Sequence, residues 1–354
     1  MKRLVVVLLL AFAACESQEP PPAACGPIPQ VTVNAGETAT VTGCFDDPSG
    51  DTLVYPGPLF DLEIAFTSSV SSTVRSHVRD ARDEWEAVLE DTELDEVTID
   101  EERSCLGISR YVGTVDDHLI LVHVDSIDGE GGWLAYAGYC YRRLADDSPV
   151  LSATWIDSAD VERMLDEDAL VPVAFHELAH ALGFSGRHWG RLALLDEDED
   201  YDPHFEGELA IEAFDEAGGE DYDGEKVNHW RESVFRDEIM TPFINLENDE
   251  LPISAITLQA MADAGYEVDV SRADDYELPD PTVPPPGALA KGGRAVFDLS
   301  NDVVWGPVTV LDADGRIIRV IPPPPGSVRW PPPGREVRIE PPAPPRNPQR
   351  LRPR

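Results

Sequence analysis

The sequence has no apolar run long enough to cross a membrane as a mature helix. Its longest such run, Leu4–Ala14, follows Lys2-Arg3 and spans eleven residues, whereas a spanning helix needs about 20. A basic start followed by a short apolar core is typical of a signal peptide. We therefore expect residues 1–15 to be a signal peptide and the chain to be exported.

The predicted signal peptide ends in Phe12-Ala13-Ala14-Cys15. This ending resembles a bacterial lipobox, whose cysteine receives a lipid after cleavage. The resemblance implies a lipid anchor at Cys15 and a place in the bacterial cell envelope. Because Phe12 is unusual at the first position of such a box, ordinary secretion is the alternative.

Basic residues are also scarce: 27 Lys and Arg stand against 68 Asp and Glu, a formal charge of −41. Such acidity argues against nucleic acid or an anionic lipid surface as a partner for the body of the chain. Only residues 281–354 reverse the sign, with eleven Lys and Arg against six Asp and Glu. The acidic run Asp196–Asp202 offers oxygen ligands for Ca2+, but blocks of like charge repel one another, which favours a solvated loop.

Cysteine is rare as well, at five residues. Setting Cys15 aside leaves an even number in a chain expected to be exported, and an oxidising compartment favours disulfides. The simplest of the possible connectivities pairs neighbours in sequence, Cys25 with Cys44 and Cys105 with Cys140. The alternative is free buried thiols.

The motif with the clearest chemistry lies within Val173–Phe184, where His176, Glu177 and His180 have the His-Glu-x-x-His spacing of zinc hydrolases. On a helix, residues four apart share one face, so both imidazoles point at one spot. Neutral imidazoles bind Zn2+, and Glu177, adjacent but not a ligand, is placed to take a proton from an attacking water. Apolar neighbours predict a buried helix that ends at Gly183. The alternative is a buried helix with a chance match.

A catalytic zinc needs a third protein ligand and an open position. In the short metzincin motif the third histidine comes six residues after the second, where this chain has Gly186. A carboxylate, as in thermolysin-type enzymes, is the other option. The candidates are therefore His188, His204, His229, Glu206 and Glu208.

The surroundings of His229 resemble the leishmanolysin family of metzincin zinc proteases. In that family a long insertion separates the helix from a third histidine, often followed by Trp, and a Met-turn comes later. Here His229-Trp230 and Glu238–Pro242 match, within a resemblance that runs from about residue 59 to 279. The resemblance implies three Zn2+ ligands, a general base and a Met-turn residue, which are His176, His180, His229, Glu177 and Met240 respectively.

Hydrophobic periodicity predicts an α+β fold. Residues 61–66 alternate as a strand, and apolar residues from Val74 to Val88 recur at helical spacing. Residues 119–124, 132–141 and 150–156 are predicted strands, and 208–214 and 254–264 are predicted helices. With the resemblance, this pattern implies a metzincin-type catalytic domain with a mixed twisted sheet, a long active-site helix and an irregular C-terminal subdomain.

We divide the chain into four parts. After the signal peptide, residues 16–58 form a tether and a β-rich fragment, residues 59–280 the zinc protease domain, and residues 281–354 a Pro-rich basic tail. The fragment resembles the opening strands of a cadherin-like or Ig-like module, which needs about 100 residues when complete. Within the tail, which holds 18 of the 32 prolines, residues 308–321 predict a hairpin about residues 312–315.

These observations favour an exported zinc endopeptidase that acts on a protein or peptide substrate. The family resemblance also implies that an edge strand, best matched by Gly132–Tyr139, binds the substrate backbone by strand addition. The alternative is a cell-surface adhesion or binding lipoprotein with a structural or vestigial zinc site, which the module-like residues 31–55 and the Pro-rich tail favour. The carboxylate of Glu177 argues against this alternative, because a structural site has no use for a base.

Overall fold

The structure is a computed structural model of the 354-residue chain. It describes residues 60–89, 92, 94–196, 204–219, 228–246, 251–280 and 296–323, and elsewhere only the backbone of short strands. The chain forms two compact units, Met1–Asp61 and Leu62–Arg354. No helix in these ranges is both long and apolar enough to span a bilayer.

The first unit contains two antiparallel strand pairs. β1 (Val6–Leu9) pairs with β2 (Ile28–Val31), and β3 (Gly43–Asp46) pairs with β4 (Thr52–Tyr55). The second pair lies on either side of residues 47–51 in the sequence. Cys15 and Cys25 lie outside the described residues, and the side chain of Cys44 is not described either. Lipidation and the pairing of Cys25 with Cys44 therefore stay predictions.

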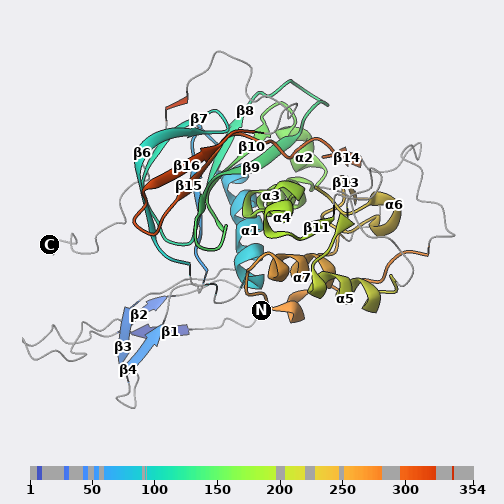
Figure 1. Ribbon diagram of the computed structural model, residues 1–354, viewed down its shortest axis with the longest axis horizontal. Coiled ribbons are helices and arrows are strands. Elements are labelled where there is room, and N and C mark those ends of the chain that lie inside the picture. The colour runs from blue at the N-terminus through green and yellow to red at the C-terminus, as the bar shows by residue number, and fades with distance from the viewer. Residues whose placement is uncertain are drawn as a thin grey trace, which may run out of the picture. The chain divides into compact units, whose positions relative to one another are not determined.

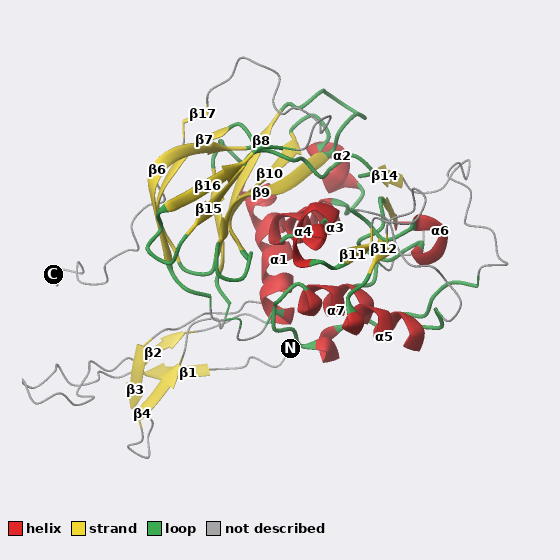
Figure 2. Ribbon diagram, in the orientation of Figure 1, coloured by secondary structure: helices red, strands yellow, loops and turns green. Residues whose placement is uncertain are grey.

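The second unit is built on a mixed six-stranded sheet, shown in Figures 1 and 2. Its strands, in spatial order, are β16 (Ile317–Ile321), β15 (Val308–Leu311), β9 (Ala135–Arg143), β10 (Pro149–Asp157), β8 (His118–Asp125) and β5 (Leu62–Phe66). β10, β8 and β5 are mutually parallel, whereas β9 runs antiparallel to β10. The predicted α+β class with a mixed sheet is confirmed.

Both faces of this sheet are covered. Two helices, α1 (Ser72–Val88) and α3 (Leu170–Leu182), pack on one face and on each other. Their contact includes a hydrogen bond of 2.9 Å from the indole N–H of Trp85 to the carbonyl oxygen of Phe175. On the other face lies a hairpin of β6 (Val97–Cys105) and β7 (Ile108–Val115). Burial on both faces explains why β8 is an almost unbroken apolar run rather than an alternating one.

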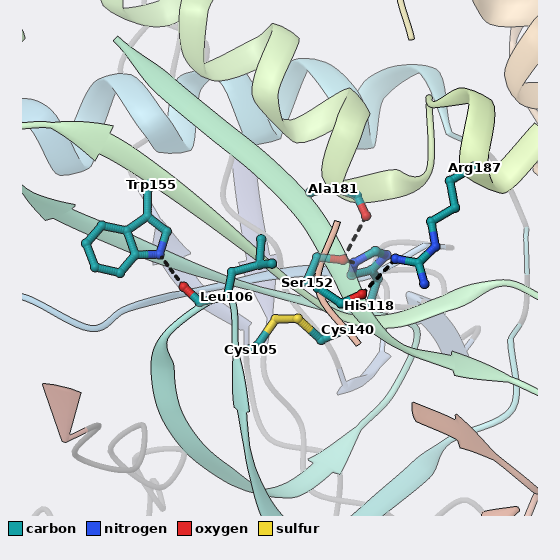
Figure 3. The surroundings of a disulfide bond; sticks show 9 residues. Cys105, Leu106, His118, Cys140, Ser152, Trp155, Ala181 and Arg187 are labelled. Carbon is teal, nitrogen blue, oxygen red and sulfur yellow. Dashed lines mark hydrogen bonds between the residues drawn. A yellow bond between two sulfur atoms is a disulfide. The ribbon is translucent and has the colours of Figure 1, made fainter. Parts of the chain in front are cut away.

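A disulfide ties the covering hairpin to the sheet. Cys105, at the end of β6, is bonded to Cys140 in β9, with 5.4 Å between the Cα atoms. Beside it, the indole N–H of Trp155 donates to the carbonyl oxygen of Leu106 at 3.0 Å (Figure 3). The hairpin is therefore held against the sheet at two neighbouring points.

After α3 the described elements become short and irregular, as expected for the C-terminal subdomain. They are α4 (Gly186–Leu192), β11 (Leu195–Asp196), β12 (His204–Phe205), α5 (Glu208–Glu216), α6 (Glu232–Phe235), β13 (Phe243–Asn245), α7 (Ala255–Asp263) and a 3-10 helix (Val270–Arg272). Ser254 caps α7 as predicted, because its Oγ accepts the Thr257 N–H at 3.2 Å.

Part of the region assigned to a Pro-rich tail is folded into the second unit. β14 (Val296–Asp298) pairs with β13, and β15 and β16 form the predicted hairpin and extend the main sheet. The alternating apolar side chains of β15 are buried there, a local signal that the surrounding prolines mask. β17 (Val337–Arg338) pairs with β7. The other domain boundaries stay predictions.

A buried histidine between the sheet and α3 makes stability depend on pH. The Ser152 hydroxyl donates to the Ala181 carbonyl oxygen (2.7 Å) and lies 2.7 Å from His118 Nε2, so that nitrogen is the donor (Figure 3). Burial, and then the charge of Arg143, lower the pKa of His118 to about 3. Below pH 6.5 the unfolded chain therefore binds a proton that the folded chain refuses, and stability falls as the pH falls.

We expect His118→Gln, whose amide can still donate to Ser152, to remove this dependence. Between pH 7 and pH 5 the wild type should lose about 2 kcal/mol of unfolding free energy more than the variant does. Urea unfolding of both proteins at the two pH values measures the difference. Equal losses in both proteins would show that His118 is not the group responsible.

Candidate metal centre

The helix α3 carries the His-Glu-x-x-His motif through the middle of the second unit. Pro172 lies in its first turn, where its missing N–H costs no hydrogen bond, and the helix ends at Gly183 with φ of 110°. That left-handed conformation favours glycine, and a Cβ at this position would also crowd the ring of His188. His176, Glu177 and His180 are all buried.

Backbone carbonyls fix the orientation of both helical imidazoles. His176 Nδ1 donates to the carbonyl oxygen of Ile239 at 2.7 Å, and His180 Nδ1 donates to that of Phe184 at 2.6 Å. With a proton on each Nδ1, each Nε2 presents a lone pair, and these two atoms lie 3.0 Å apart. Burial also lowers the pKa of His176 and so favours the neutral form that binds metals.

His229 reaches the same point from a distant loop. Its Nε2 lies 3.2 Å from His180 Nε2. The next residue, Trp230, donates its backbone N–H to the Met240 carbonyl oxygen at 3.0 Å and its indole N–H to Thr257 Oγ1 at 2.7 Å. The indole is also stacked on Phe235, with 5.3 Å between ring centroids. Trp230 therefore anchors the loop that positions His229.

The turn around Met240 is held by a buried carboxylate. Glu238 accepts the backbone N–H of Met240 at 2.6 Å, and its other oxygen accepts from Ser254 (2.9 Å to Oγ) and Thr257 (2.5 Å). Burial raises the pKa of Glu238 to about 7, even though these hydrogen bonds favour its ionised form. Because Ile239 accepts from His176, the turn and the metal site form one hydrogen-bonded unit.

A fourth side chain, Asp302, completes the cluster. Its Oδ2 lies 3.0 Å from His176 Nε2, and its Oδ1 lies 3.1 Å from His229 Nε2. Among the described residues, this is the group of His, Cys, Asp and Glu side chains that could hold a metal ion.

The spacing of the four side chains fits Zn2+. Zinc takes nitrogen and oxygen ligands at about 2.0–2.1 Å in a tetrahedron, so neighbouring ligand atoms should be roughly 3.3–3.4 Å apart. Five of the distances between ligand atoms here are 3.0 to 3.6 Å, and all of these atoms lie within 4.8 Å of one another. Three imidazoles and a carboxylate are also ligands that zinc accepts. The residues present therefore fit the metal.

Glu177 lies beside this cluster without belonging to it. It is fully buried, and among the described residues neither of its carboxylate oxygens finds a hydrogen-bond partner. Burial, and then the charge of Asp302, raise the pKa of Glu177 well above its usual range. Burying an unpaired carboxylate costs free energy. A role as general base, which needs a group free to accept and release a proton, would account for it.

The structure leaves the other candidate ligands outside the cluster. His188 is buried against Tyr139, with 5.5 Å between ring centroids, and His204 lies in β12. Glu206 and Glu208 are exposed. Most of the acidic run Asp196–Asp202, for which a solvated loop is favoured over a Ca2+ site, lies outside the described residues. Asp302 was missed because it belongs to no motif and follows α3 by more than a hundred residues.

The strand edge implied by the family resemblance is not free in this structure. The resemblance implies that Gly132–Tyr139 is an edge strand, but β9 is an inner strand of the sheet. β10 pairs with one side of it, and on the other side Ala137 bonds to residues 302 and 304 and β15 continues the pairing. The sequence alone gives no sign of this, because the covering strands come from the Pro-rich region.

Comparison with known proteins supports the resemblance seen in the motifs. The family model described as Leishmanolysin matches residues 71–204. The chain is also similar to a leishmanolysin of Leishmania amazonensis, with 26% identity over 182 residues. That match covers 47% of this chain and spans only 30% of the relative's length.

We expect His229→Ala to weaken zinc binding, because it removes one of the three converging nitrogens. The loss of affinity should exceed the roughly 10–100-fold that removal of an outer-shell partner costs. Zinc affinity measured by competition with a chelator tests this, with His204→Ala and His188→Ala as folded controls that keep their zinc. If His188→Ala releases zinc while His229→Ala does not, the assignment of His229 is wrong.

Proposed function

We propose that this leishmanolysin-like chain is a zinc-dependent endopeptidase that hydrolyses peptide bonds within proteins. The observation that carries the proposal is the combination of three converging imidazoles with an adjacent carboxylate that makes no hydrogen bond. A metal site built only for stability needs the first feature and not the second. The similarity to a leishmanolysin supports the same reaction class.

His176, His180 and His229 would hold the metal, with Met240 in the turn beneath them. A zinc ion held there acts as a Lewis acid on a carbonyl group and lowers the pKa of water to about 7. The carbonyl groups of Ile239 and Phe184 keep two of the imidazoles in the tautomer that leaves Nε2 free.

Glu177 would carry the proton through the reaction. It accepts a proton from the attacking water and passes it to the amine that leaves the cleaved bond. A carboxyl group with a raised pKa takes up and holds a proton more readily than an ordinary one, which suits a group that must carry a proton between the two steps. Burial around the site also limits bulk water, which strengthens these interactions.

We further propose that the protein acts outside the cytoplasm. The signal-like residues 1–15 and the lipobox-like ending at Cys15 support export to the bacterial cell envelope, with a lipid anchor. The even number of remaining cysteines, and the bond between Cys105 and Cys140, suit an oxidising compartment.

A second candidate function is a cell-surface adhesion or binding lipoprotein with a structural zinc site. The observation that favours it is the fourth side chain, Asp302, because structural zinc sites have four protein ligands and catalytic sites keep one position open. Glu177 argues against it, because a purely structural site has no use for a buried carboxylate that finds no hydrogen-bond partner among the described residues.

Glu177→Gln separates the two functions. The change keeps the shape of the side chain and removes the base, so zinc content should match the wild type and the melting temperature should not fall. The rate of protein cleavage should fall by at least the roughly 10²–10⁴-fold typical of a lost general acid–base. The matched control is Glu208→Gln, at an exposed carboxylate, which should keep its activity. Cleavage by Glu177→Gln at the wild-type rate would rule out this mechanism.

A further inference from the structure

Residues 302–304 lie along β9 as an added strand. The Ala137 N–H donates to the Asp302 carbonyl oxygen at 2.9 Å, and the Val304 N–H donates to the Ala137 carbonyl oxygen at 3.0 Å. Ala137 and Val303 form a parallel bridge, and β15 continues the pairing as far as Arg143. The hydrogen-bonding groups of Ala137 that would grip an extended peptide are therefore in use.

The contact is closely fitted. Gly138 has no side chain at the point where the Val304 carbonyl oxygen approaches, and a Cβ there would collide with that oxygen. Further along, Arg187 donates from Nη1 to the carbonyl oxygen of Gly306 at 2.7 Å. Asp302 and Val304 are both buried. The backbone of this segment is therefore packed closely against β9 and bonded to Arg187.

The same segment delivers a carboxylate to the metal position. Asp302 lies at the end of the added strand, and its two oxygens approach the imidazoles of His176 and His229 at 3.0 and 3.1 Å. A catalytic zinc needs that fourth position for water and substrate. One short segment thus fills both the strand-binding edge and the reactive position.

We propose that Asp302–Gly306 is an inhibitory segment of the protein itself, which holds the active site closed until it is displaced; this inference rests on the proposed peptidase function. Asp302 blocks the metal, and residues 303–306 occupy the place of a substrate backbone. Only molecules in which the segment has left β9 can bind a substrate. The activity of the protein is therefore proportional to the fraction of molecules that are open.

The competing explanation is that Asp302 is a permanent structural ligand. In that case the metal should depend on Asp302 for its retention, and opening the fourth position should serve no purpose. The unpartnered carboxylate of Glu177 next to the cluster favours a site that opens. Retention of metal after loss of Asp302 distinguishes the two explanations directly.

The first test reads the fourth position without relying on catalysis. The full-length chain is loaded with Co2+, and its visible spectrum is followed as acetohydroxamate, a small metal chelator, is added. In Asp302→Ala the spectrum should shift with an acetohydroxamate affinity at least tenfold higher than in the wild type. Asp298→Ala is the matched control, since this exposed carboxylate of β14 accepts the nearby Ser300 N–H and lies outside the metal cluster, and it should behave as the wild type.

The second test weakens the contact between the segment and β9 while leaving Asp302 in place. Val304→Pro removes the N–H that donates to the Ala137 carbonyl oxygen. The change lies in the inhibitory segment and leaves the sequence of β9 as it is. Zinc-loaded Asp302→Ala and Val304→Pro should each cleave casein at least tenfold faster than the wild type, with melting temperatures that show a folded chain. Adding Glu177→Gln to Asp302→Ala should abolish the gain.

The outcomes separate the two claims. Loss of Co2+ from Asp302→Ala, or equal acetohydroxamate affinity in Asp302→Ala and the wild type, overturns the inhibitory segment and leaves the peptidase proposal standing. If acetohydroxamate binds only the opened variants but none of them cleaves casein, occupancy of the fourth position is upheld and the peptidase function is overturned.

Discussion

Two hydrogen bonds from imidazole Nδ1 atoms to backbone carbonyls are the interactions on which the rest of the site depends. They fix the tautomers of His176 and His180, so that two nitrogen lone pairs point at one buried position. Burying these lone pairs without a partner costs free energy, which a bound metal ion would offset. One carbonyl, that of Phe184, follows the helix, and the other, that of Ile239, belongs to the turn of Met240. The helix and the turn must therefore be folded together before a metal can be held.

That requirement gives the irregular C-terminal subdomain a defined task. Its helices and strands are short, but the rings of five aromatic residues pack together in it. They are Phe184, Trp189, Phe205, Trp230 and Phe235. Trp230 belongs to this cluster and is the residue after His229, and its indole N–H donates to Thr257 of α7. Glu238 joins the turn of Met240 to the start of α7, since it accepts the backbone N–H groups of Met240 and Ser254. Side-chain packing and buried hydrogen bonds thus replace regular secondary structure in placing His229.

The sequence allowed the helices and most central strands to be predicted, because their signals are local. The apolar stripe of α1, the run in β8 and the Ser254 cap each lie within one element. His229 was different: the residues alone left five candidates open, and only the resemblance to leishmanolysins selected it. Asp302 and the coverage of β9 could not be predicted, since they depend on pairing between segments more than 150 residues apart within a Pro-rich context.

We propose that one metal ion is held by side chains from three separate parts of the chain. Crystals of the zinc-loaded protein, measured on both sides of the zinc absorption edge, test it most directly. We expect one anomalous peak about 2.0–2.1 Å from the Nε2 atoms of His176, His180 and His229, with the Asp302 carboxylate as the fourth ligand. A zinc peak at other side chains, or a peak with His229 turned away from it, would show that this set of ligands is wrong.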